Sequence, residues 1–223
     1  MNKKIIGTEL RSSIYENLSV IMSAMSSPVR LRIIQILAQS PRSVEELSGE
    51  TQQSIANTSQ HLQKMAMAGL VSCQKRGVSR IYSLASVQVL RIWENLQVLG
   101  EELSSDIVDL TDELVPAELC TELSTASVYR KVKSGRAFLV DMREEKERDA
   151  SPVEWSSSLT SDDLMAKDLQ LARTKEYFLF CRGRYCQLAN KAVLSLRKNG
   201  FKAYRLRESP FVLNSVLLEV PTR

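Results

Sequence analysis

The segment from residue 27 to residue 84 constrains the fold most, because three short helical patterns are followed by two β-prone runs. The first pattern opens with Ser27 and Pro28. Serine caps the free amides of a first turn, and proline fits the first helical position. Apolar residues then recur at helical spacing until Pro41. The sequence therefore predicts a helix that starts at residue 28.

Two further helices are predicted in quick succession. Ser43 and Glu46 have the spacing of a capping box, which indicates the start of a second helix. Gly49 is expected to end this helix early. A third helix is predicted from about residue 52 to residue 68, where Gly69 supplies a left-handed stop.

The outer face of the third helix is rich in amide, hydroxyl and cationic side chains. Base edges and phosphates in a major groove require such groups, whereas an ordinary surface helix more often carries Glu/Lys pairs. A merely solvated polar face is the alternative. The candidate DNA-contacting residues on this helix are Ser54, Asn57, Thr58, Gln60 and Lys64.

A basic hairpin is predicted directly after the third helix. Two β-prone runs, 70–74 and 81–84, flank a loop that contains Gly77. In a helix-turn-helix unit followed by a β-wing, basic wing residues lie near the phosphate backbone. The candidates here are Lys75, Arg76 and Arg80.

The run 53–71 resembles the recognition helix of ArsR-type winged-helix repressors, through Ser59-Gln60-His61-Leu62 and Ala68-Gly69-Leu70-Val71. The resemblance covers about residues 15–110. It implies an α+β winged helix-turn-helix domain that binds a double-stranded DNA operator as a homodimer. Many members of that family sense metals through two cysteines in the second helix, but 45–49 contain none. We therefore expect neither a metal site nor a cofactor.

A long amphipathic stretch runs from Val87 to Leu114. Its apolar residues recur every three or four positions, which requires a partner along the whole length. They are Leu90, Trp93, Leu96, Leu99, Leu103, Ile107 and Leu110. Such a helix either lies in the core of one chain or joins two chains. In the resembling family the final helix and the N-terminal helix, here about Arg11–Met25, form the dimer, so we expect a dimer.

Length and charge favour two domains. The 223 residues exceed one typical domain, and we expect domains at 1–112 and 113–223. The net charge is +5 over 1–84, −6 over 85–150 and +5 over 151–223, so the basic N-terminal part suits a polyanion. Four cysteines are too few for a disulfide scaffold, and no apolar run reaches the ~20 residues of a membrane span. We expect a cytoplasmic protein with reduced thiols and no membrane partner.

The C-terminal part has the alternating pattern of an α/β domain. Strand–helix–strand order with short links implies a parallel sheet. The strands are expected at 137–140, 177–180 and 201–206, the helices at 124–133, 162–171 and 188–196, and a hydroxyl-rich loop at 156–161.

Cys181 is expected at the carboxyl end of a parallel strand, just before a helix. Open α/β sheets bind their ligands there, and the loop 181–187 can turn backbone N–H groups inward. Arg182 and Arg184 add positive charge. Each effect lowers the pKa of a thiol and favours a nucleophilic thiolate. A buried cysteine after a strand is the alternative.

The run 181–189 resembles the active loop of rhodanese-like sulfurtransferases, in particular those fused behind ArsR-type winged helices. Asp141-Met142-Arg143 matches the Asp-x-Arg that closes an early strand in that family. The resemblance implies that Cys181 carries a persulfide. It also implies that Arg182 and Arg184 attract a small sulfur-containing anion or persulfide donor.

Cys186 is either a second thiol that resolves an oxidised Cys181 into a disulfide or a small buried residue. Two rhodanese segments are missing, because 146–155 has no glycine or histidine and 207–211 replaces a Gly-x-x-x-Trp segment. Three functions therefore remain open. The chain is a repressor controlled by sulfur or redox chemistry at Cys181, a sulfurtransferase with an accessory winged helix, or a regulator with an inactive rhodanese-like domain.

Overall fold

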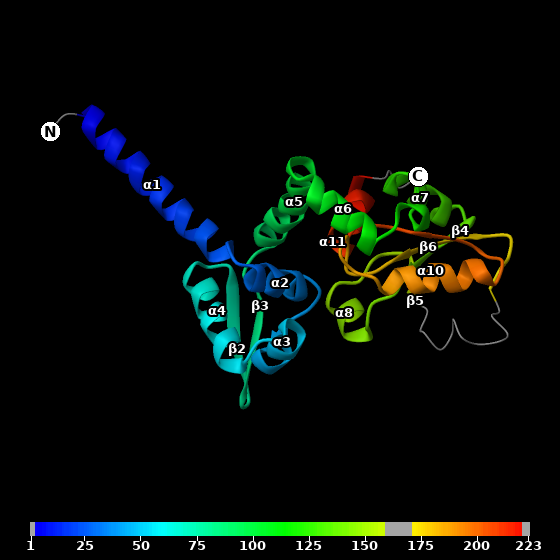
Figure 1. Cartoon of the computed structure of the whole chain (residues 1–223), viewed down its shortest axis with the longest axis horizontal. Coiled ribbons are helices and arrows are strands. Elements are labelled where there is room, and N and C mark those ends of the chain that lie inside the picture. Colours follow the sequence, from blue (N-terminus) through cyan, green and yellow to red (C-terminus); the bar gives the residue numbers. More distant parts are fainter. Residues whose placement is uncertain (1–2, 159–170, 220–223) are drawn as a thin grey trace. The chain divides into compact units, whose positions relative to one another are not determined.

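The computed structural model describes residues 3–158 and 171–219, and it divides the chain into two compact units, 1–100 and 101–223 (Figure 1). The boundary comes twelve residues before the expected one, which lies within helix α6 (Ser105–Leu114). Each unit has a core and a sheet of its own.

The first unit is a bundle of helices against a three-stranded sheet. The antiparallel sheet has the order β1-β3-β2. Its core includes Ile33, Ile34, Leu47, Leu62 and Met65. The elements are α1 (Lys3–Met25), α2 (Pro28–Leu37), β1 (Arg42–Ser43), α3 (Val44–Thr51), α4 (Ile55–Met67), β2 (Val71–Arg76), β3 (Ser79–Leu84) and α5 (Val87–Leu103), whose last three residues, from Glu101, belong to the second unit.

Local signals set the bounds of α3 and α4. The capping box is confirmed: Glu46 donates its backbone N–H to Ser43 Oγ at 3.2 Å, and Ser43 donates its own to Glu46 Oε2 at 2.6 Å. The prediction that Gly49 ends α3 is wrong. The left-handed residue is Gln52, with φ +58°, and its N–H bonds to the Gly49 carbonyl. Ser54 then caps α4, which starts three residues later than predicted.

The predicted hairpin is confirmed as β2 and β3. Gly77, with φ +61°, takes the left-handed conformation that a tight turn requires at its tip. Lys75 pairs with Arg80 across the hairpin, and Arg76 pairs with Ser79.

The amphipathic stretch that was expected as one helix is two. Ser104 is extended, with φ −139° and ψ 114°, and separates α5 from α6. Its hydroxyl accepts a hydrogen bond from the Ile107 N–H at 3.4 Å. A serine in this conformation begins a new helix and breaks the apolar stripe between Leu103 and Ile107.

The second unit contains a four-stranded sheet with the order β5-β4-β6-β7, and every pairing in it is parallel. The prediction of a parallel α/β sheet is confirmed. The elements after α6 are η1 (Ala117–Leu119), α7 (Thr125–Lys133), β4 (Ala137–Asp141), α8 (Glu145–Ala150), β5 (Ser156–Ser158), β6 (Glu176–Phe180), α10 (Leu188–Lys198), β7 (Lys202–Arg205) and α11 (Pro210–Glu219).

The edge of this sheet differs from the sequence prediction. The serines expected in a loop at 156–158 form an edge strand instead, because their backbone pairs with Leu139–Asp141 of β4 whatever their side chains. The helix predicted over 162–171 lies outside the described residues, apart from its last position.

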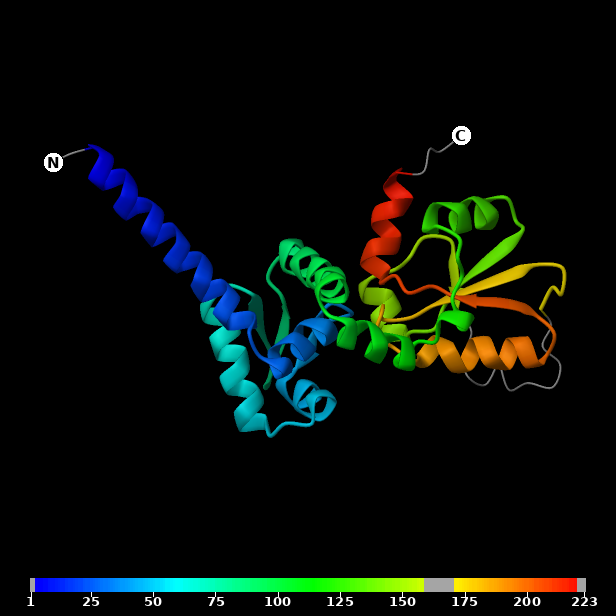
Figure 2. The ribbon, with the colours of Figure 1, turned by 45° about the horizontal axis from the view of Figure 1, so that its top comes forward.

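Helices cover both faces of the sheet. Residues of α10 such as Val193 and Leu196 pack with Leu179 on one face. Val128 of α7 and Leu213 of α11 pack with neighbouring sheet residues on the other. Figure 2 shows α10 in orange on one side of the strands, and α7 in green and α11 in red on the other. Because every pairing is parallel, the carboxyl ends of the strands meet at one edge of the sheet, where the candidate thiols lie.

Within the described part of the chain, no single helix is both long and apolar enough to cross a membrane. One pair, Gly7–Met25 with Pro28–Leu37, passes that test jointly on length and composition, with a bend of 83° between the helices.

Candidate functional site

Helix α4 presents a polar face to solvent. Ser54 at its N-cap accepts a hydrogen bond from the Asn57 N–H at 3.1 Å, which fixes the first turn. The Asn57 side-chain amide donates to Gln53 Oε1 at 2.6 Å and is partly exposed. Gln60 and Lys64 are exposed on the same face, three and seven positions after Asn57. Four of the five side chains predicted on this helix are thus accessible together.

Thr58 must be removed from that set. Its side chain is fully buried, and its hydroxyl has no hydrogen-bond partner among the described residues. The reason is its position on the helix, because Thr58, Leu62 and Met65 share the spacing of one buried face.

The three basic wing residues are all exposed at the hairpin. Lys75 and Arg80 lie directly opposite each other, and Arg76 adjoins them near the tip. Like charges in directly opposite positions destabilise a hairpin. A polyanion beside the wing would remove that repulsion.

His61 connects α4 to the helices beneath it. Its Nδ1 lies 3.4 Å from Nη1 of Arg30, whose Nε donates to the Ala24 carbonyl at 2.7 Å. Partial burial, followed by the charges of Arg30 and Lys64, lowers the pKa of His61. The imidazole is therefore a neutral packing group in the helix-turn-helix unit.

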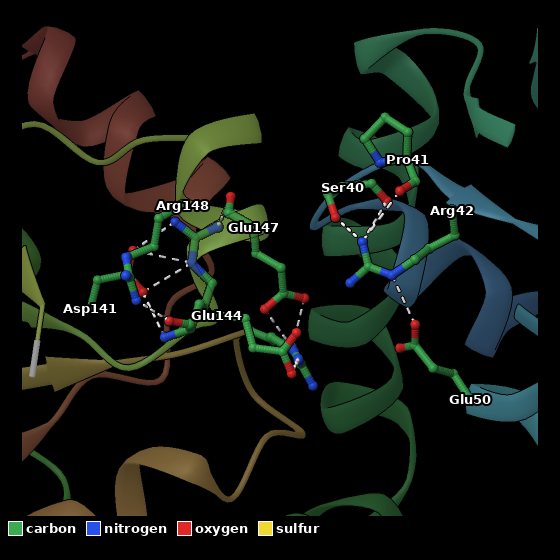
Figure 3. A network of polar contacts seen from close by, with 10 residues as sticks. Ser40, Pro41, Arg42, Glu50, Asp141, Glu144, Glu147 and Arg148 are labelled. Atoms are coloured by element: carbon green, nitrogen blue, oxygen red, sulfur yellow. Dashed lines mark hydrogen bonds and ion pairs between the residues drawn. The ribbon is translucent and has the colours of Figure 1, made fainter. Parts of the chain in front are cut away.

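A buried arginine fixes the connection between α2 and α3. Arg42 ion-pairs with Glu50 at 2.8 Å and donates to the Ser40 side chain and the Pro41 carbonyl (Figure 3). These bonds tie β1 to Glu50 near the end of α3, and so fix the frame on which α4 is placed.

The candidate thiols lie in the second unit, in the loop between β6 and α10. Cys181 follows β6 directly and is fully buried, and its Sγ donates to the Cys186 carbonyl at 3.4 Å. Cys186 is partly exposed, two residues before α10. The structure brings both cysteines to the carboxyl edge of the parallel sheet, as predicted.

The two thiols differ in acidity, in the opposite sense to the expectation for Cys181. Burial raises the pKa of Cys181 well above its ordinary value. The neighbouring Cys181 side chain and the backbone N–H groups of Arg182 and Leu188 lower the pKa of Cys186 to about 6. Burial thus disfavours a thiolate at Cys181, whereas the groups around Cys186 favour one there.

Arg182 and Arg184 each form ion pairs with carboxylates of the chain. Arg182 Nε lies 2.8 and 2.9 Å from the two carboxylate oxygens of Glu147, and Nη2 lies 3.4 Å from Glu144. Arg184 Nη1 lies 2.6 Å from Glu101, within the same unit. Both predicted anion-attracting residues are thus ion-paired within the chain, and they anchor the loop.

Asp141 and Arg143 form a buried clamp instead of lying against the thiols. Arg143 Nη2 donates to Asp141 Oδ2 and to the Ser151 carbonyl, both at 2.7 Å, and Nη1 donates to the Glu147 carbonyl at 3.3 Å. Figure 3 shows Asp141 and Glu147 in this network. The clamp fixes α8, and Glu147 of α8 in turn holds Arg182.

Sequence reasoning missed Arg205. This β7 residue is fully buried, and its Nη2 donates to the Gly183 carbonyl at 3.0 Å while Nη1 donates to the Asn190 side chain. Among the described residues it has no carboxylate partner, and its charge favours a thiolate at Cys181. The sequence did contain a signal. Ala203 and Arg205 are two positions apart, so both lie on the same face of the strand, which is buried.

The geometry of the two units defines a class of protein: a winged helix-turn-helix domain followed by a parallel α/β domain with a two-cysteine loop. Residues 27–72 match the model of the "Bacterial regulatory protein, arsR family". The N-terminal region is therefore an ArsR-family winged-helix domain of the transcriptional-regulator type.

Similar proteins include one of nearly the same length. The "HTH-type transcriptional regulator Rv0324" of Mycobacterium tuberculosis is 26% identical over 200 residues, which cover 89% of this chain and 88% of the relative. The homodimeric winged helix-turn-helix DNA-binding domain of Mb0332 from Mycobacterium bovis is 27% identical, over 41% of this chain and 85% of that one, with a TM-score of 0.40. Reduced HlyU from Vibrio cholerae is 31% identical over 41% and 96%, with a TM-score of 0.38.

Proposed function

We propose that this chain is a sequence-specific DNA-binding transcriptional regulator that acts as a repressor on a double-stranded DNA operator. The observation that carries the proposal is the exposed polar face of α4 next to a basic hairpin. Amide side chains at a helix N-terminus suit base edges, and exposed Lys and Arg on a wing suit phosphates. The printed name of the full-length mycobacterial relative, an HTH-type transcriptional regulator, supports the same function.

The regulator acts as a homodimer in this proposal. Helix α1 carries a stripe of exposed apolar side chains at four-residue spacing, each more than half exposed: Leu10, Ile14, Leu18 and Met22. An apolar stripe of this length on an isolated helix needs a partner surface. A second copy provides it, because two-fold operators require two recognition helices.

The test begins with selection of a binding site from a random pool of duplex DNA by the full chain. Fluorescence anisotropy on the selected duplex should then show tight binding that weakens steeply with salt. The variant Lys75→Ala/Arg76→Ala/Arg80→Ala should lose binding. Lys198→Ala, which removes an exposed cation from α10, is the control and should bind as the wild type does. Failure to enrich any sequence would refute the proposal.

The second domain, in this proposal, is rhodanese-like and transfers or senses sulfur through the loop that contains Cys181. Two observations support it: the loop follows a parallel strand and precedes a helix, and it holds two neighbouring thiols. A small sulfur-containing anion or persulfide donor would supply the sulfur. Loading of the loop would change operator affinity.

Two alternatives have distinct outcomes. In the first alternative, the chain turns over thiosulfate, Cys181→Ser abolishes the turnover, and operator affinity is the same with and without sulfur on the loop. The chain would then be a sulfurtransferase with an accessory winged helix. Absence of any sulfur adduct on the loop, with intact operator binding, would leave an inactive rhodanese-like binding domain. A sulfur adduct that changes operator affinity supports the proposal.

A further inference from the structure

The two loop thiols occupy unequal positions. Cys181 ends β6 and is fully buried in the core cluster that includes Leu179 and Ala189. Cys186 is partly exposed and stands just before α10. An electrophile from solvent therefore reaches Cys186 first, whereas Cys181 is reached only through the loop.

We propose that residues 181–187 form a two-thiol site in which Cys186 is the attacking sulfur and buried Cys181 is the resolving one. The substrates are small electrophiles that accept two electrons, such as a peroxide or the sulfane sulfur of a polysulfide. This inference deepens the proposed role of the second domain and reverses the assignment of the nucleophile.

The polar groups around the loop favour negative charge on Cys186. Its sulfur accepts from the backbone N–H groups of Arg182 and Leu188, the first residue of α10, and the charge of Arg182 adds to them. A helix N-terminus and inward N–H groups stabilise a thiolate. Cys181 sits in apolar surroundings that disfavour its ionisation.

The loop folds back on itself and brings the two cysteines together. Cys181 Sγ donates to the backbone carbonyl of Cys186 at 3.4 Å, so its side chain lies against that residue. Gly183, with φ +99°, makes the reversal, and its carbonyl is held by Arg205. The resolving thiol therefore already lies beside the attacking one.

The chemistry balances with a peroxide as oxidant. The Cys186 thiolate attacks one oxygen, the O–O bond breaks, and Cys186 becomes a sulfenic acid while the leaving hydroxide takes a proton. Cys181 then loses its proton, its sulfur attacks the Cys186 sulfur, and a second hydroxide leaves as water. Two thiols and one peroxide give one disulfide and two waters.

A polysulfide follows the same course with sulfur in place of oxygen. The Cys186 thiolate takes the terminal sulfur atom and the shortened polysulfide leaves with the electron pair of the broken S–S bond. Attack by Cys181 on the Cys186 sulfur then releases hydrosulfide and leaves the same disulfide. The pair is oxidised by two electrons in both cases.

The test uses the full chain with Cys73→Ser and Cys120→Ser, so that only the loop thiols remain. Limiting iodoacetamide at neutral pH, followed by peptide mass spectrometry, should label Cys186 about tenfold more than Cys181. Preferential labelling of Cys181 would overturn the inference. This measurement leaves both loop cysteines in place, so it does not depend on a variant that fails to fold.

Trapping distinguishes the two oxidants. With limiting hydrogen peroxide or inorganic polysulfide, the background chain should form the Cys181–Cys186 disulfide. Adding Cys181→Ser should trap one oxygen or one sulfur atom on Cys186, whereas adding Cys186→Ser should leave Cys181 reduced. A sulfur adduct on Cys181 in the latter variant would overturn this inference but keep the proposed sulfur role. No adduct on either cysteine would remove both.

Discussion

Arg205 donates a hydrogen bond of 3.0 Å from Nη2 to the carbonyl oxygen of Gly183, from the end of β7 to the middle of the cysteine loop. The guanidinium also binds the side chain of Asn190, whose own amide donates to the Leu114 carbonyl at 3.0 Å. One buried cation therefore fixes the loop, the first turn of α10 and the end of α6.

Arg205→Ala should destabilise the second unit. The change leaves the Gly183 carbonyl and the Asn190 side chain without their donor, at about 1–3 kcal/mol for each buried group left unpaired. Urea unfolding of the full chain measures the loss. Lys202→Ala, at an exposed position of the same strand, should change stability by less than about 0.5 kcal/mol. Equal effects of the two changes would contradict the role of Arg205.

The reactivity of Cys186 should depend on pH with a midpoint near 6. Its pKa is lowered to about 6 from an ordinary 9.0, so the folded chain loses this proton at lower pH than an unfolded one. The iodoacetamide rate should be at its plateau at neutral pH and fall as the pH drops through 6. A rate that still rises steeply near pH 9.0 would show an ordinary thiol.

Glu147→Gln should lower the pKa of Cys186 further. Arg182 contributes to the low pKa of that thiol, and Glu147 neutralises part of its charge from 2.8 Å. Without the carboxylate the positive charge acts on the thiolate undiminished, so the midpoint of the alkylation profile should move to lower pH. Glu144→Gln is the matched control, since that carboxylate is largely exposed and 3.4 Å away, and should shift the midpoint less.

Asn57→Ala should relax the base specificity of DNA binding. The Asn57 amide lies on the exposed face of α4, and a side chain that reads a base edge is worth about 1–3 kcal/mol of discrimination. Competition between the selected duplex and single-base variants measures the change. Unaltered discrimination at every position of the site would remove Asn57 from the reading surface.

Arg76→Ala should weaken binding to all sequences alike. A phosphate contact at the wing carries no sequence information, and its loss should reduce the slope of log affinity against log salt by about one. The measurement is anisotropy at several salt concentrations on specific and random duplexes. A loss confined to the specific duplex would assign Arg76 to base contact instead.

The features that sequence predicted well depend on neighbours along the chain. Ser43 and Glu46 are three residues apart, and Gly77 needs only a local turn, so the capping box and the hairpin follow from pattern. Gly49 misled because a glycine can also sit inside a helix, and the left-handed stop fell on Gln52. The burial of Thr58 was predictable, because its spacing from Leu62 and Met65 already places it on the apolar face of α4.

The features that sequence could not supply depend on contacts between distant segments. Arg182 meets Glu147 across 35 positions, and Arg205 meets Gly183 across 22. Pattern placed Cys181 at the correct end of its strand. Its depth of burial, and with it the direction of its pKa, depends on side chains from β6, α10 and β7 that only the folded chain assembles.

Gly183 has a consequence for the C-terminal helix. A Cβ at this glycine would lie 3.2 Å from the Cβ of Ser209, the residue just before α11, which is tighter than almost all real Cβ contacts. With φ +99° as well, position 183 accepts no larger residue without backbone strain and displacement of Ser209. The start of α11 and the cysteine loop can therefore pack this closely only because residue 183 has no side chain.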